Sequence, residues 1–438
     1  MEEMEKKSGS SFVSETIKEK PINKKKLLRR TMTTVGLAII FGLIACLTFF
    51  LMEPVINGIV NPTEITKVSF PEETEELKPE ELLTEEEIAQ QEESLQEVVE
   101  AAKKMVKSEQ FGNKALDNYR DIYTQLQSLA EEASAAIVTV IAISEKQNWF
   151  AGTTENENTA AGLILAENGA EMLILADVNH FSNAHEYRVR FCDKNIVEAQ
   201  LKEKDAQTGL GVYAVKLSDL PKETAQVIEK AKLGTSTSRN MVGSPALTIG
   251  APYGTSGSLS YGMITTIEKK LTLNDAIYNV IMTDMGKSQN ASGVIINLRG
   301  EVIGVVTQSA DTASATGTIA ALGISDIKPL IEKLSNDEKR AYIGIRGMDV
   351  TELAHEETGV PYGLYVSEVV TESPAMVAGI QNGDVIVSIS GKKINSYSDY
   401  KASILSIQPE TIVEVVLMRF DGTKYSDIKK EIMTGEAQ

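Results

Sequence analysis

The chain has 438 residues, 42% of them hydrophobic, and a formal net charge of −19 at pH 7. Because nucleic acids need a concentrated basic face, we expect no nucleic-acid partner. The three histidines and two cysteines form no CxxC or other metal-binding spacing, so we expect neither a metal site nor a cofactor.

The N-terminus carries the pattern of a membrane anchor. Nine Lys or Arg residues against five Glu in the first thirty residues predict a basic cytoplasmic tail, residues 1–32. Residues 33–52 contain no charge, and twenty helical residues at roughly 1.5 Å each span a bilayer core of about 30 Å. A cleaved signal peptide is the alternative, but its charged region would be unusually long and no A-x-A site follows Met52. We therefore predict a single-pass protein of the cell membrane whose later domains are extracytoplasmic.

Residues 53–125 are predicted to form an acidic helical stalk. Glutamate dominates its first half, which keeps that part solvated and extended. Ile88, Leu95 and Ala102 recur every seven residues, which favours a short coiled coil. A second helical pattern, Leu116 to Leu129, either packs on the next domain or mediates self-association.

From residue 126 to 338 the pattern is that of an all-β barrel domain. Short β-branched runs are separated by Gly, Asn and Asp turns, for example at Ile137 to Ile143, Tyr278 to Thr283 and Val302 to Val306. Cys192 is predicted to lie in one of the strands and Cys46 in the apolar span, so no disulfide is expected.

Several segments of this domain carry motifs of one protease family. They are ILADVNHFSNAHEYRVRF from Ile174, DAQTGLGV from Asp205 and TDMGKSQNASGVIINLRGEVIGVVTQ from Thr283, with AGLI, GAPYG and DIKPLI from positions 161, 250 and 326. Together they resemble the HtrA/DegP family of trypsin-like serine proteases. The resemblance implies a mainly β fold with a trypsin-like double β-barrel, a role in extracytoplasmic protein quality control, and a homotrimer.

The same resemblance indicates a degenerate catalytic triad. When the family's motifs are aligned with this chain, Asn179 stands at the position of the catalytic histidine, Gly209 at that of the aspartate and Ala291 at that of the nucleophilic serine. His180 and Ser292 lie one place further on, and a local shift in register would restore them. No shift of one residue restores the aspartate, whose loss alone costs about four orders of magnitude in turnover in well-studied triads.

Residues near these positions also differ from those that the family uses for catalysis. Gln289 or Asn290, depending on register, replaces a glycine that allows the turn whose N–H groups stabilise the oxyanion. Asp205 is the acid nearest to Gly209, but it occupies the family's turn-forming position. His185 is the only other histidine of this domain that could act as a base.

Residues 339–434 resemble a single PDZ domain. Its landmarks are YIGI from Tyr342 and SPAMVAGIQNGDVIVSISGKKI from Ser373. In PDZ domains the first of these loops presents N–H groups to the terminal carboxylate of a peptide, and the following strand adds the peptide as a further strand. The alternative is a domain that only packs on the barrel. The predicted peptide-binding residues are Tyr342, Ile343, Gly344 and Ile345.

The sequence therefore favours a membrane-anchored, HtrA-like pseudoprotease. As a sensor, adaptor or regulator it would bind extended or C-terminal segments of extracytoplasmic or unfolded proteins, as a homotrimer or with an active relative. The first alternative is an active serine endopeptidase of protein quality control that uses His180 and Ser292. The second is a purely structural anchor.

Overall fold

The computed structural model describes residues 67–70, 111–148, 152–181, 184–313 and 317–437, which all belong to one compact unit, Ile65–Gln438. The predicted tail at 1–32, the apolar span at 33–52 and the heptad pattern of the stalk lie outside these residues. Among the helices of the described ranges, none is long and apolar enough to cross a membrane.

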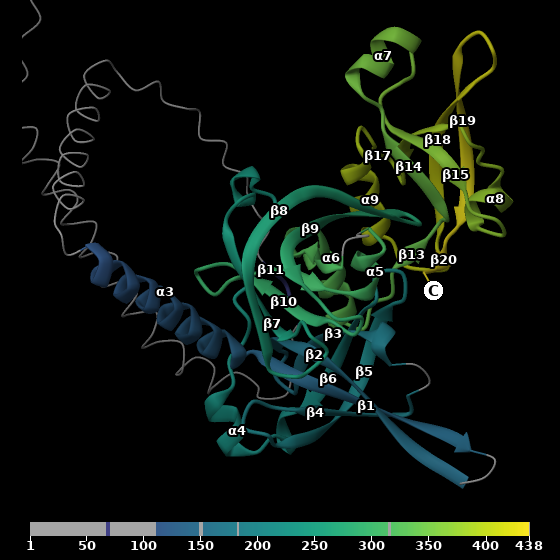
Figure 1. Ribbon diagram of the computed structural model, residues 1–438. Helices are drawn as coiled ribbons and strands as arrows, with labels where there is room; N and C mark the ends of the chain where they lie inside the picture. Colours follow the sequence, from purple (N-terminus) through teal and green to yellow (C-terminus); the bar gives the residue numbers. More distant parts are fainter. Residues whose placement is uncertain (1–66, 71–110, 149–151, 182–183, 314–316, 438) are drawn as a thin grey trace, which may run out of the picture. The chain divides into compact units, whose positions relative to one another are not determined.

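Six antiparallel strands close the first barrel in the order β1-β2-β3-β6-β5-β4 (Figure 1). Strand β5 shows why they form: Val197 and Ala199 are buried, while the residues between them face solvent. The strands are β1 Ile137–Asn148, β2 Gly152–Glu167, β3 Glu171–Asp177, β4 Glu186–Arg190, β5 Ile196–Asp205 and β6 Leu210–Lys216.

The second barrel closes in the order β10-β11-β12-β9-β8-β7. Every residue of β10 and β11 is buried, because β10 also contacts β2 of the first barrel and β11 also contacts a helix, α6. The prediction of a trypsin-like double barrel is confirmed. The strands are β7 Pro245–Ala251, β8 Ser258–Leu273, β9 Ala276–Gly286, β10 Ser292–Ile296, β11 Val302–Val306 and β12 Thr318–Gly323.

Short helices connect the barrel strands, and α6 (Ile324–Ser335) follows the last of them. Ile324, Ile327 and Ile331 lie on one face of α6 at helical spacing and are buried in the core of the second barrel. The shorter helices are η1 Val178–His180, η2 Leu217–Asp219, α4 Lys222–Val227, η3 Arg239–Met241 and α5 Gln308–Asp311.

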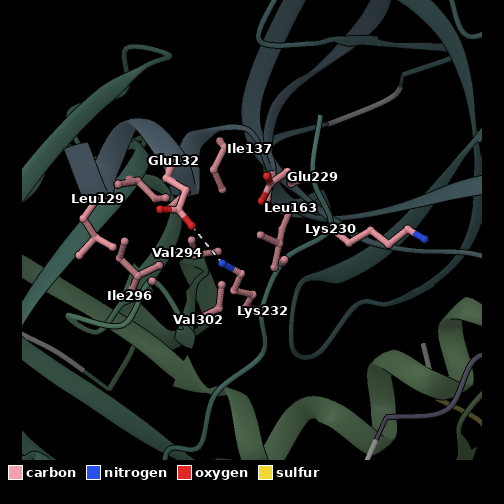
Figure 2. Close-up of a pocket in the computed structure, with 15 residues that line it drawn as sticks. Leu129, Glu132, Ile137, Leu163, Glu229, Lys230, Lys232, Val294, Ile296 and Val302 are labelled. Atoms are coloured by element: carbon pink, nitrogen blue, oxygen red, sulfur yellow. Dashed lines mark hydrogen bonds and ion pairs between the residues drawn. The ribbon is translucent and has the colours of Figure 1, made fainter. Parts of the chain in front are cut away.

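Helix α3 (Phe111–Ser134) contains the second helical pattern of the predicted stalk, and its two halves differ. Leu126 and Leu129 pack against the barrel core, whereas Leu116 and Ile122 are exposed. Figure 2 shows Leu129 of this helix among apolar side chains of the second barrel, with Glu132 paired to Lys232 at 3.0 Å. The C-terminal half therefore lies on the barrel, as the first of the two sequence alternatives predicted.

A separate β domain follows α6, with its sheet in the order β14-β15-β16-β18-β19 and its own buried core. Strand β14 is an edge strand, so one of its sides pairs with no other strand of this sheet. The elements are β13 Ala341–Tyr342, β14 Ile345–Asp349, α7 Glu352–Thr358, β15 Leu364–Val369, α8 Pro374–Ala378, β16 Val385–Ile389, β17 Lys392–Lys393, α9 Tyr397–Ser406, β18 Ile412–Phe420, β19 Tyr425–Met433 and β20 Gly435–Glu436.

A buried ion pair joins this domain to the first barrel. Arg340 Nε lies 2.5 Å from Asp205 Oδ2, and their side chains are only 2% and 1% exposed. Arg340 Nη1 also donates to the carbonyl of Asn274, in the turn between β8 and β9. One guanidinium therefore ties two turns of the barrels to the segment that enters β13.

The structure corrects one prediction about the cysteines. Cys192 lies in the exposed turn after β4 and not in a strand, because the strand ends at Arg190. Phe191 remains buried and accepts a hydrogen bond from Lys194 that closes the turn. Cys46 lies outside the described residues.

Candidate functional site

Asn179 and Gly209, at the predicted positions of the triad histidine and aspartate, lie next to each other in the first barrel. Asn179 lies in η1, and Gly209 lies in the turn between β5 and β6 with φ +78°. A Cβ atom at position 209 would lie 2.3 Å from Asn179 Nδ2 and 2.6 Å from Asp177 Oδ1. The place of an orienting carboxylate is therefore already filled by neighbouring side chains.

Asp177 holds this corner together, and the sequence analysis did not single it out. Its carboxylate caps η1 by accepting from the N–H of Asn179 at 2.9 Å. It also accepts from the N–H of Gln308 at 2.6 Å, at the start of α5. Asn179 Nδ2 donates to Ser309 Oγ of the same helix at 3.3 Å. An acidic residue two positions before Asn179, which is typical of a helix N-cap, is the feature of the sequence that could have identified Asp177.

His180 points into the same corner but has no nucleophile beside it. Its Nε2 lies 3.8 Å from Asp177 Oδ2, and its Nδ1 lies 3.3 Å from Gln308 Nε2. Burial lowers the pKa of His180, and the nearby Ala291 carbonyl and Asp311 carboxylate oppose this only in part. The imidazole is therefore neutral around pH 7. His185 contributes a main-chain N–H to the carbonyl of Ile143 and is not part of this corner.

The buried carboxyl of Asp177 predicts a dependence of stability on pH. Burial raises its pKa from 3.8 to about 6. The folded state then binds more protons than the unfolded state between about pH 4 and 6, so stability falls as the pH rises through this window, by about 3 kcal/mol in total. The lowered pKa of His180 acts in the opposite direction, since stability is lost as the unfolded state protonates below its ordinary value of 6.5.

An Asp177→Asn variant isolates the first effect, because His180 is present in both proteins. Between pH 7 and pH 4, the free energy of unfolding of the wild type should gain up to about 3 kcal/mol relative to the variant. Urea unfolding at a series of pH values measures this difference. A difference that stays constant with pH would show that Asp177 titrates normally.

Ser292 is buried and bonded to a strand of the first barrel. It is the first residue of β10, pairs with Ala251 of β7 and is 1% exposed. Its Oγ accepts a hydrogen bond of 2.9 Å from the N–H of Ala161 in β2, so it links the two barrels. Among the described residues, no hydrogen bond connects Ser292 with His180 or His185.

The predicted position of the nucleophile itself carries no reactive group. Ala291 is buried, and its N–H, which would be one donor of an oxyanion hole, donates to the carbonyl of Ser288 at 3.3 Å. Gln289 and Asn290 are not among the residues with positive φ, so the backbone there lacks the turn that a glycine would favour. The N–H of Ala291 is therefore bonded within the loop between β9 and β10.

Asp205 acts as a turn former and an anchor for Arg340. Its Oδ1 accepts from the N–H of Thr208 at 2.9 Å and from Thr208 Oγ1 at 3.0 Å, and its carbonyl accepts from the N–H of Gly209. Its Oδ2 faces Arg340 and not a histidine. This agrees with the structural role that the sequence suggested.

The second predicted site, Tyr342 to Ile345, lies between β13 and β14. Gly344 has φ +90°, and a Cβ atom there would lie 2.2 Å from Ser373 Cβ, so only glycine fits. The N–H groups of Ile343, Gly344 and Ile345 converge on one point. That point is occupied by the carboxylate of Asp275, at the tip of the β8–β9 hairpin, which the sequence analysis did not identify.

Comparisons with known proteins show similarity to a family of proteases and to the PDZ domain family. Residues 341–429 match the PDZ domain family. A probable periplasmic serine endoprotease DegP-like of Buchnera aphidicola subsp. Schizaphis graminum is 30% identical over 253 residues, which cover 56% of this chain and 51% of the relative. The chain is similar to HtrA/DegP-type serine proteases with a PDZ domain.

Two further relatives extend the similarity. The serine protease Do-like HtrA of Lactococcus lactis subsp. cremoris is 27% identical over 265 residues, 55% of this chain and 63% of that protein. The serine endoprotease DegS of Salmonella typhimurium is 28% identical over 254 residues, 55% of this chain and 68% of that protein. The chain spans about half the length of the DegP-like relatives that it matches.

Solved structures show the same fold. The HtrA-type protease AlgW with tripeptide superimposes with a TM-score of 0.51 at 21% identity and covers 71% of this chain and 96% of that one. The same protease with decapeptide gives a TM-score of 0.50 at 18% identity, with coverage of 71% and 98%. At these identities the likeness concerns the fold alone.

Proposed function

We propose that this chain is a catalytically inactive HtrA-like protein that recognises peptide segments through its PDZ domain. The observation that carries the proposal is the position of Ser292, whose hydroxyl is buried between the barrels and bonded to Ala161. A serine nucleophile needs a base within about 3 Å to take its proton. Here His180 faces Gln308 and Asp177 instead.

Two other parts of the mechanism are also missing from the cleft. The space beside Gly209 holds Asn179 and Asp177, so a side chain at position 209 cannot orient an imidazole there. The carboxylate of Asp177 lies 3.8 Å from His180 Nε2 but accepts hydrogen bonds from the N–H groups of Asn179 and Gln308. The N–H of Ala291 is used inside its own loop, so it is not aimed at a developing oxyanion. Because orientation of the base and stabilisation of the oxyanion each contribute several kcal/mol, losing both leaves recognition as the remaining activity.

A fluorophosphonate probe tests the proposal directly. We expect no covalent label on Ser292 and no degradation of unfolded casein, while the periplasmic serine endoprotease DegQ of Escherichia coli, as a positive control, does both. A Ser292→Ala variant should be indistinguishable from the wild type in both assays. Labelling or turnover that disappears in this variant would overturn the proposal.

The alternative is an active serine endopeptidase that uses His180 and Ser292. It is supported by the names of the relatives, which are serine endoproteases, and by Asp177 beside His180. For this activity the start of β10 must change register, so that Ser292 releases Ala161 and turns toward the cleft. The probe experiment above distinguishes the two candidates.

We further propose a tether in the membrane and an extracytoplasmic location for the barrels and the PDZ domain. The uncharged stretch 33–52 with its basic flank supports the tether, and the periplasmic relatives support the location. The chain should stay with membranes after carbonate extraction, and a variant without residues 1–52 should not. Release of the full chain by carbonate would contradict the tether.

The proposed partners are C-terminal or extended segments of extracytoplasmic proteins, and further copies of this chain or an active relative. The exposed apolar residues Leu116, Tyr119 and Ile122 on α3 support self-association. Sedimentation of the detergent-solubilised chain should give a trimer that is lost when these three residues are replaced by serine. A wild-type monomer would remove self-association from the proposal.

A further inference from the structure

The carboxylate-binding loop of the PDZ domain already holds a carboxylate from its own chain. Asp275 Oδ2 accepts from the N–H groups of Ile343 at 2.8 Å and Gly344 at 2.7 Å. Its Oδ1 accepts from the N–H of Ile345 at 3.0 Å and from the hydroxyl of Tyr400 at 2.6 Å. All three loop amides that would bind the terminal carboxylate of a peptide are therefore taken.

Asp275 also uses the edge of the sheet where a peptide strand would begin. Its own N–H donates to the carbonyl of Ile345 at 2.8 Å, at the start of edge strand β14. A peptide that adds as a strand pairs with these same main-chain groups. The residue thus imitates a C-terminal residue twice, through its carboxylate and through its main-chain N–H.

The surrounding residues hold Asp275 in this position. It is 1% exposed and lies in the left-handed region with φ +59°, which aspartate tolerates better than most residues. Two arginines hold the adjacent Asn274: Arg340 Nη1 donates to its carbonyl at 3.2 Å, and Arg346 Nε donates to its Oδ1 at 2.9 Å. The tip of the β8–β9 hairpin is therefore preorganised for the loop.

We propose that Asp275 is an internal ligand of the carboxylate-binding loop and competes with the terminal carboxylate of a partner. This inference rests on the proposed peptide recognition. A partner binds only when the hairpin tip leaves the loop, so its apparent affinity falls by the fraction of molecules in which the loop is open. Departure of the tip also disturbs Asn274, one of the two acceptors of Arg340, whose other acceptor is Asp205 beside the degenerate triad.

Two substitutions of Asp275 test the competition in the full chain, purified in detergent. Asp275→Asn keeps the size and the turn preference of the residue but places an NH₂ group against N–H donors. Asp275→Gly removes the side chain and accepts the positive φ without strain. The matched control is Glu414→Gln, which makes the same change of charge at an exposed side chain of the PDZ domain whose partner is Lys429 and not a residue of the hairpin tip.

The probes are fluorescein-labelled octapeptides that end in valine or phenylalanine, each as a free acid and as a C-terminal amide. In fluorescence anisotropy we expect both Asp275 variants to bind at least one free acid about tenfold more tightly than the wild type and the control. Affinity for the amides should not change. Hydrogen exchange at residues 343–345 of the unliganded chain should become faster in both variants.

Each other outcome is decisive. If the wild type and the Asp275 variants bind the free acids equally, competition is refuted while peptide recognition stands. If exchange becomes faster but no peptide binds any variant, the loop serves only to dock the hairpin, and both peptide recognition and competition fail. Unchanged exchange would show that Asp275 does not protect the loop, which also refutes the inference.

Discussion

Replacing Arg340 by methionine is expected to lower the free energy of unfolding by about 3–5 kcal/mol, because it leaves the carboxylate of Asp205 buried and unpaired. Both side chains are almost completely buried. Burial opposes the charge of Arg340, but the carboxylates of Asp205 and Asp275 and the hydroxyl of Tyr278 hold its pKa above the ordinary value. The guanidinium therefore stays charged in the folded protein.

Urea unfolding followed by circular dichroism measures this loss, and two comparisons show its cause. In the double variant Asp205→Asn, Arg340→Met neither charge of this pair remains buried, so part of the stability should return. Arg299→Met breaks a pair with Glu301 in which the arginine is 76% exposed, and it should cost much less stability than Arg340→Met because solvent screens the pair. If Arg340→Met costs no more than Arg299→Met, the buried pair does not stabilise the junction.

Replacing Gly293 by alanine is expected to cost about 2–5 kcal/mol, through backbone strain together with a collision that the fold cannot relieve. Gly293 has φ +130°, and a Cβ atom there would lie 2.1 Å from the carbonyl oxygen of Ile249. Neither backbone can move freely, because Gly293 pairs with Gly250 on one side and Val306 on the other.

Gly286→Ala is the matched control, since it lies in the same barrel with nothing within 4 Å of its Cβ position. Thermal unfolding should show a large decrease in Tm for Gly293→Ala and little change for Gly286→Ala. Equal stability of the two variants would mean that β7 and β10 lie further apart than described. This glycine follows directly after Ser292, and the close approach of β7 gives it a structural role that does not require catalysis.

The buried residues at the junction give the altered triad region a physical connection to the PDZ domain. The turn that carries Gly209 is closed by Asp205, and Asp205 is paired with Arg340. Arg340 in turn holds Asn274, next to the residue that fills the carboxylate-binding loop. The contacts of one arginine therefore join the two regions.

The strands and the order of the domains could be predicted from the sequence because their signals are local. Short β-branched runs with turn residues between them predicted strands that fall within β1, β9 and β11, and YIGI predicted the segment that joins β13 to β14. The HtrA-like double barrel and the PDZ domain are confirmed, whereas the membrane span at 33–52 and the loss of proteolysis remain predictions.

The sequence by itself determined that an HtrA-like double barrel is followed by a PDZ domain, and it predicts altered residues at all three triad positions. Only the tertiary structure decided where Ser292 points, because successive side chains of a strand face opposite sides and the pairing of Ser292 with Ala251 sets that choice. It also decided what occupies the PDZ loop. Asp275 and Gly344 are 69 positions apart, and only packing of the β8–β9 hairpin brings them together.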